Sequence, residues 1–136
     1  MSVQDQYGNL VVRSLVADAS GTEVQSIVSG SNSTPVRHVV EIKNWSTIPY
    51  DISVEVVLPQ GRQRLSFDGA TDRWTANIWS LARRDTERDG CGITASGGRT
   101  GKERVHCTAV KWKKAGRHRW TDAKSRLPLS LTVNIT

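Results

Sequence analysis

The chain has 136 residues and a mass of 15.0 kDa, which is enough for one domain of ordinary size and too little for two. Hydrophobic residues make up 37% and charged residues 24%, and Lys and Arg outnumber Asp and Glu by 19 to 13, so the formal net charge is +6. This composition excludes a coiled coil, a collagen and a disulfide-dense mini-protein. It also excludes a membrane protein, because no stretch approaches the roughly 20 apolar residues of a membrane span.

The amino-terminal segment is polar and differs in character from the rest of the chain. It has neither the basic region nor the apolar region of a signal peptide. The chain is therefore expected to be a native cytoplasmic product or a mature fragment of a secreted protein carrying a new Met. We predict an arm over residues 1–9, either frayed or docked on a partner, ahead of one domain over residues 10–136.

Apolar side chains alternate with polar ones along several runs, as in strands that bury one face. The strongest such runs are Leu10–Val16, Val36–Lys43, Ile52–Leu58 and Leu129–Ile135. Weaker ones are Val24–Val28, Arg64–Phe67, Trp74–Leu81 and Arg104–Trp112. Turn residues separate the runs at 29–35, 59–61, 68–69 and 96–101, and the charged segment 80–88 is predicted to be a loop. Seven to nine short strands predict an all-β sandwich or small barrel.

The two cysteines, Cys91 and Cys107, flank the glycine-rich turn at 96–101. If they lie on neighbouring strands, a disulfide between them would contribute about 3 kcal/mol in the chain-entropy model. Free thiols are the alternative. A zinc site that recruits His106 and His118 is set aside, because no Cys-x-x-Cys pair is present and adjacent strand residues point to opposite faces.

No catalytic arrangement is visible. There is no Gly-x-Ser-x-Gly motif, and the three histidines, His38, His106 and His118, each stand alone. His38 lies inside a predicted strand, where a surface or hydrogen-bonded structural side chain is expected. We therefore predict a protein that is not an enzyme, with no catalytic residue, no metal site and no cofactor.

The positive charge is concentrated between residues 99 and 126, which contain ten basic and two acidic side chains. Strand alternation would place Lys111 and Lys113 on one face and Trp112 on the other, in the core. The basic face is then either simply solvated, or it docks on an acidic protein surface or a nucleic-acid strand. Any of the five Trp that is exposed would mark an interface. The candidate docking residues are Tyr7, Lys111, Lys113, Lys114, Arg117 and Arg119.

One set of motifs goes beyond composition. It comprises residues 39–46, 49–54 and 57–61, followed by Cys91, residues 105–108 and residues 129–133. It resembles the Ig-like conserved-repeat domains of bacterial surface proteins over about residues 36–136. Those domains have a strand that ends in Asn and a small turn, a strand that ends in Leu-Pro-x-Gly, a Cys pair across a hairpin and a closing Thr-Val strand. The resemblance implies an Ig-like β-sandwich in which Cys91 and Cys107 form the sandwich disulfide.

Domains of that family are spacers and adhesive modules. Because the sequence shows no export signal, we expect a structural protein of a virus particle that decorates or cements a capsid by protein–protein contacts after assembly in the host cytoplasm. Tailed phages carry Ig-like modules of this kind. An adhesive or spacer module of an extracellular bacterial surface assembly is the first alternative, and a nucleic-acid-binding domain that uses residues 99–126 is the second. An oligomer is compatible with the sequence.

Overall fold

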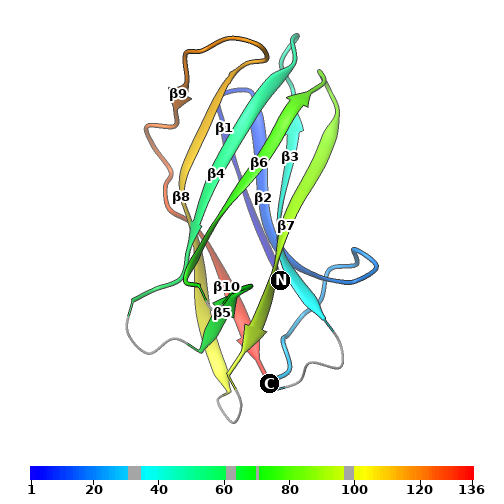
Figure 1. The fold of residues 1–136 in the computed structure, drawn as a ribbon, viewed down its shortest axis with the longest axis vertical. Helices are drawn as coiled ribbons and strands as arrows, with labels where there is room; N and C mark the ends of the chain where they lie inside the picture. Colours follow the sequence, from blue (N-terminus) through cyan, green and yellow to red (C-terminus); the bar gives the residue numbers. More distant parts are fainter. Residues whose placement is uncertain (31–34, 61–63, 70, 97–99) are drawn as a thin grey trace.

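The computed structural model of the chain describes residues 1–30, 35–60, 64–69, 71–96 and 100–136, so the turns predicted at 29–35, 59–61 and 96–101 lie partly outside it. Two antiparallel sheets pack face to face (Figure 1), which confirms the all-β sandwich predicted from the strand pattern. Sheet A has the order β1 (Ser2–Tyr7), β2 (Leu10–Asp18), β3 (Val36–Asn44), β7 (Thr86–Ala95), β5 (Leu65–Phe67). Sheet B has the order β10 (Leu129–Ile135), β8 (Gly101–Lys114), β4 (Tyr50–Val57), β6 (Arg73–Leu81), and the short β9 (Thr121–Asp122) also pairs with β8.

The core lies between the two sheets and is built by the alternation seen in the sequence. Strands of both sheets point alternate apolar side chains into it, and burial of one Val, Leu or Ile contributes about 1.5–3 kcal/mol. Sheet A contributes Leu10, Val12, Val16, Val40 and Ile42, and sheet B contributes Ile52, Val54, Val56, Val105, Val110 and Val133. Over the described ranges the chain forms no helix, and so none that is long and apolar enough to cross a membrane.

The amino-terminal segment is an integral strand of sheet A and not the separate arm predicted for residues 1–9. A two-residue turn, Gly8-Asn9, joins β1 to β2, and Tyr7 pairs with Leu10 across it. Met1 is buried, and its amino group donates hydrogen bonds to the Glu23 carboxylate and to the carbonyl of Val24. Few apolar residues mark this strand in the sequence, because most of its side chains point to solvent.

A second difference concerns β7, whose first residues fall in the segment predicted to be a loop. Arg88 lies on the outer face of sheet A, opposite Glu41 of β3, whereas the neighbouring Asp89 accepts a hydrogen bond from the Asn77 amide of β6. Conversely, the predicted strand at 24–28 forms only isolated bridges. It connects the two sheets, since the Val24 amide bonds to Val16 of β2 at 3.0 Å and the Ile27 amide bonds to Asn134 of β10 at 2.8 Å.

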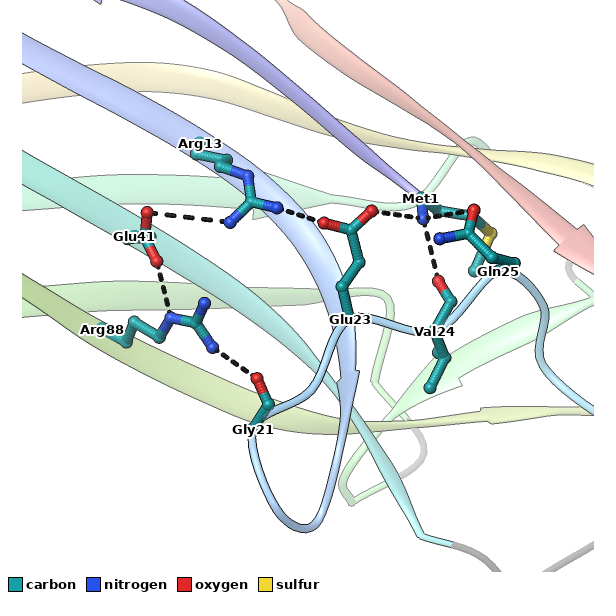
Figure 2. A network of polar contacts seen from close by, with 8 residues as sticks. All are labelled: Met1, Arg13, Gly21, Glu23, Val24, Gln25, Glu41 and Arg88. Atoms are coloured by element: carbon teal, nitrogen blue, oxygen red, sulfur yellow. Dashed lines mark hydrogen bonds and ion pairs between the residues drawn. The ribbon is translucent and has the colours of Figure 1, made fainter.

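An alternating row of charges crosses the outer face of sheet A (Figure 2). Arg13 contacts Glu23 and lies 3.7 Å from the Glu41 carboxylate, to which Arg88 Nε donates at 2.7 Å. The hydrogen bond from the amino group of Met1 holds the pKa of the Glu23 carboxyl below its ordinary value. Both arginines of this row are therefore neutralised by carboxylates.

The turn between β1 and β2 gives the first testable prediction. Gly8 has a φ of +56°, and a Cβ there would lie 2.8 Å from Trp112 Cζ2, an atom of a rigid, half-buried ring. We expect Gly8→Ala to lower the free energy of unfolding, measured by urea denaturation, by about 3 kcal/mol through backbone strain and overpacking together. The matched control is Gly116→Ala, where φ is +78° and no atom lies within 4 Å of the added Cβ. Strain alone should cost about 1 kcal/mol there; equal losses in the two variants would contradict the contact with Trp112.

Candidate functional site

Four connections meet at one end of the sandwich, away from the carboxyl terminus (Figure 1), and we call them together the loop end. They are the turn at 8–9, the β3–β4 loop at 45–49, the β6–β7 loop at 82–85 and the β8–β9 loop at 115–120. Backbone hydrogen bonds join them. The Trp45 amide bonds to Asn9 at 2.9 Å, the Asn44 amide bonds to Asp85 at 3.0 Å and the Ala115 amide bonds to Pro49 at 3.2 Å.

A cleft of about 560 Å³ opens at the loop end beside the last residues of β8. Trp112 is half-buried against the core while Lys111 and Lys113 lie on the other face of β8, which confirms the orientation predicted from alternation. The cleft brings most of the predicted docking residues together. Its walls are Tyr50, Trp112, Lys113, Lys114, Arg117, His118, Arg119 and Thr121.

Trp120 lies against β8, where its ring contacts the ammonium groups of two lysines. The Nζ atoms of Lys111 and Lys113 each lie 5.0 Å from the centroid of its ring. Such contacts contribute about 0.5–1 kcal/mol each at exposed sites. Lys113 is also 3.9 Å from the Asp51 carboxylate. Two ammonium groups therefore already contact this indole ring.

The remaining cations of the cleft are uncompensated. Lys114, Arg117 and Arg119 are exposed, and none of them forms an ion pair with a carboxylate of the described residues. Arg13 and Arg88 on the outer face of sheet A are paired instead. Unpaired charge at one end of a small domain attracts and orients an anionic partner.

Tyr7 does not belong to the docking surface predicted for it. Its side chain is buried, and its hydroxyl donates a hydrogen bond to the Arg126 carbonyl at 2.9 Å. Burial, with a smaller contribution from Asp5, raises the pKa of Tyr7 to about 12. Its role is to hold the segment that leads into β10 against β1.

The two cysteines are free thiols in the structure. Cys91 lies in β7 of sheet A and Cys107 in β8 of sheet B, so the turn between them is a crossover between sheets and not the hairpin on which the predicted disulfide was based. Burial raises the pKa of the Cys107 thiol to about 12. In the part of the chain that the structure describes, no three His, Cys, Asp or Glu side chains cluster as metal ligands.

A chain of hydrogen-bonded side chains links the two sheets. Trp74 Nε1 donates to His38 Nδ1 at 3.1 Å, and His38 Nε2 lies 2.7 Å from Ser14 Oγ. Since Nδ1 accepts, Nε2 carries the proton and donates to Ser14, which in turn hydrogen-bonds the Cys107 thiol. Ser14 and His38 are fully buried, so this is a satisfied structural contact, one of the two environments predicted for His38.

No family model matches the chain, and no curated protein matches its sequence. Among solved structures, the CooA pilin subunit from enterotoxigenic Escherichia coli is similar at a TM-score of 0.32 and 8% identity, over 90% of this chain and 97% of that chain. A similarity of this size carries no argument about function. The loop end is therefore the basis for the function proposed below, and the resemblance to Ig-like conserved-repeat domains stays a prediction.

Proposed function

We propose that the chain is a non-enzymatic structural module that docks on an acidic protein surface through its loop end. The observation that supports this is the gathering of the unpaired cations Lys114, Arg117 and Arg119 around one cleft. Charges of this kind steer association and set its orientation, whereas the paired charges of sheet A stabilise the fold itself.

Two observations separate this proposal from its alternatives. The Ser14–His38 pair, which could otherwise suggest nucleophilic chemistry, is closed to any substrate by complete burial. Two lysine ammonium groups already contact the ring of Trp120, so a base that stacked there would have to share the ring with them. An acidic protein surface needs only the charges and is the better match.

Such a module would serve in a virus particle, as a capsid decoration or cementing protein, or in an extracellular assembly of a bacterial surface. Both settings remain predictions, and the loop end would act through protein–protein contacts in either. Immunodetection in purified particles and on intact cells separates them. Stoichiometric amounts in particles support the virion, and a surface location without particles supports the bacterial assembly.

The docking proposal is tested with poly-L-glutamate as the probe and duplex DNA as the competing polyanion. We expect the wild-type protein to bind polyglutamate, and Lys114→Glu/Arg117→Glu to bind it about tenfold less tightly, a loss of about 1.4 kcal/mol. Binding should also weaken with salt, because the screening length falls from about 10 Å at 0.1 M to about 3 Å at 1 M. Titration calorimetry or fluorescence anisotropy provides the measurement.

The matched control is Arg73→Glu/Lys102→Glu, which makes the same change in net charge where β6 and β8 begin, at the opposite end of the sandwich. It should retain wild-type affinity for polyglutamate. An equal loss in both double variants would show that only net charge matters. Tighter binding of duplex DNA than of polyglutamate would favour the nucleic-acid alternative.

A further inference from the structure

Two of the five tryptophans are exposed, and both lie toward the loop end, outside the cleft. The side chain of Trp45 is 50% exposed and that of Trp79 is 59% exposed. Trp45 directly follows β3, and the Nζ atom of Lys43 lies 4.2 Å from its ring centroid. Trp79 lies two residues before the end of β6. Exposed indoles beside cations are typical of residues that carry binding energy at protein interfaces.

Arg83 and Arg84 add a second group of unpaired cations. Both are exposed in the β6–β7 loop, and neither pairs with a carboxylate anywhere in the described ranges. The Arg84 amide donates to the carbonyl of Asn44, the residue that precedes Trp45. The side chain of Asn44 donates to the carbonyl of Leu81, two residues after Trp79. These bonds place the arginine loop beside both indoles.

The β3–β4 loop connects this second group to the cleft. Asn44, the last residue of β3 and the one before this loop, is bonded to the β6–β7 loop. At the other end of the loop Pro49 accepts from Ala115, which follows the cleft residue Lys114. Both groups of cations therefore lie at the loop end, although they are about 30 residues apart in sequence.

We infer that the docking surface covers the whole loop end, with Trp45, Trp79, Arg83 and Arg84 added to the cleft, and that its partner is an acidic protein surface that also presents apolar side chains. This inference rests on the proposed function and specifies its partner. Guanidinium groups pair with carboxylates through two parallel hydrogen bonds. Exposed indoles gain by burying apolar surface, which apolar side chains of a protein partner would supply.

The test compares poly-L-glutamate with a random copolymer of glutamate and tyrosine, which adds aromatic side chains to the same acidic backbone. We expect wild-type protein to bind the copolymer about tenfold more tightly per glutamate. Trp79→Ala should remove most of that preference and leave binding of polyglutamate unchanged. Arg83→Glu/Arg84→Glu should weaken binding of both polymers about tenfold.

Two controls isolate these effects. Val28→Ala truncates an exposed apolar side chain near the carboxyl terminus and should keep the preference for the copolymer. Arg84→Glu should add no backbone strain, because Arg84 itself has a side chain and already adopts a φ of 60°. All variants should keep the wild-type urea midpoint, since the altered side chains are exposed.

The outcomes separate the two proposals. If both polymers bind equally and Arg83→Glu/Arg84→Glu binds like wild type, the surface ends at the cleft and this inference is wrong, while the docking proposal stands. If the wild-type protein binds neither polymer, both are wrong. If it binds duplex DNA more tightly than either polymer, the partner has been assigned to the wrong class.

Discussion

Acidification from pH 6.5 to 4.5 should remove about 2 kcal/mol from the free energy of unfolding through His38 alone, because the loss approaches about 1.4 kcal/mol per pH unit below pH 6.5. Burial lowers the pKa of His38 from 6.5 to about 3. When the pH lies between these two pKa values, His38 binds a proton in the unfolded chain but not in the folded chain. The stability is therefore fully present above pH 6.5 and falls as the pH is lowered toward 3.

The hydrogen bonds of His38 explain why the folded protein resists this proton. Its Nδ1 accepts from the Trp74 indole, which can only donate, so a proton on Nδ1 would face another N–H. Its Nε2 is bonded to the Ser14 hydroxyl, and the Phe67 ring lies 6.0 Å away between centroids. The titratable neighbours are thiols, Cys91 opposite it on β7 and Cys107 beyond Ser14, and neither offers a carboxylate to balance the charge.

Urea denaturation at pH 7 and pH 5 measures the effect, and His38→Gln removes it. The His38→Gln variant should be less stable than wild type at pH 7, but its free energy of unfolding should change little between pH 7 and pH 5. The control is His118→Gln, at an exposed histidine of the cleft, which should keep the wild-type pH dependence. The Glu23 carboxyl, whose pKa is also lowered, adds to the pH dependence of stability only below its ordinary pKa of 4.5. There the stabilisation that its carboxylate provides is lost as the pH falls. The same pH dependence in His38→Gln and wild type would show that another group is responsible.

The strands that the sequence predicted well are those with one clearly apolar face. β2, β3, β4 and β10 were identified because a core on one side imposes strict alternation. β7 was missed because its charged residues are stabilised by partners across the sheet, such as Glu41 opposite Arg88, and those partners are distant in sequence. β1 was missed because its strand character depends on pairing with β2 and on burial of Met1.

The same reasoning explains which parts of the candidate site could be predicted. The cations from Lys111 to Arg119 are close together in sequence, so their gathering was visible before any fold was known. The exposed Trp45 and Trp79 and the arginines Arg83 and Arg84 join them only through contacts between loops. Tyr7 was wrongly placed on the surface because the carbonyl that receives its hydroxyl lies 119 residues further along the chain.

Asn44→Ala should lower the free energy of unfolding by about 3 kcal/mol, because three hydrogen bonds worth about 1 kcal/mol each disappear from a buried site. The Asn44 side chain is fully buried, and its Nδ2 donates to the carbonyls of Ile48 and Leu81 at 2.9 Å each. Its Oδ1 accepts from the Ser46 amide at 2.9 Å. Alanine removes these three bonds, although the Ile48 carbonyl keeps the hydrogen bond that it accepts from Ser46 Oγ at 2.6 Å. Urea denaturation measures the loss.

Two further variants define the origin of that loss. Asn44→Asp keeps the acceptor for the amide but turns a carboxylate oxygen toward two carbonyls, so it should be at least as destabilising as alanine. Asn77→Ala makes the matched change at an exposed position of β6 and should stay within about 0.5 kcal/mol of wild type. A loss in Asn44→Ala no larger than that in Asn77→Ala would contradict the role assigned to Asn44.

The position of Asn44 also ties stability to docking. Its side chain ties the end of β6, at Leu81, to the β3–β4 loop, at Ser46 and Ile48. The backbone bonds between Asn44 and the β6–β7 loop remain in the alanine variant, and the bond between Ala115 and Pro49 at the cleft does not involve Asn44. Under conditions where Asn44→Ala remains folded, its preference for the glutamate–tyrosine copolymer should therefore fall toward that of Trp79→Ala, while its affinity for polyglutamate at the cleft is largely retained. A parallel fall in both affinities would mean that the loop end responds as one rigid unit, in which the cleft depends on Asn44 as much as the indoles do.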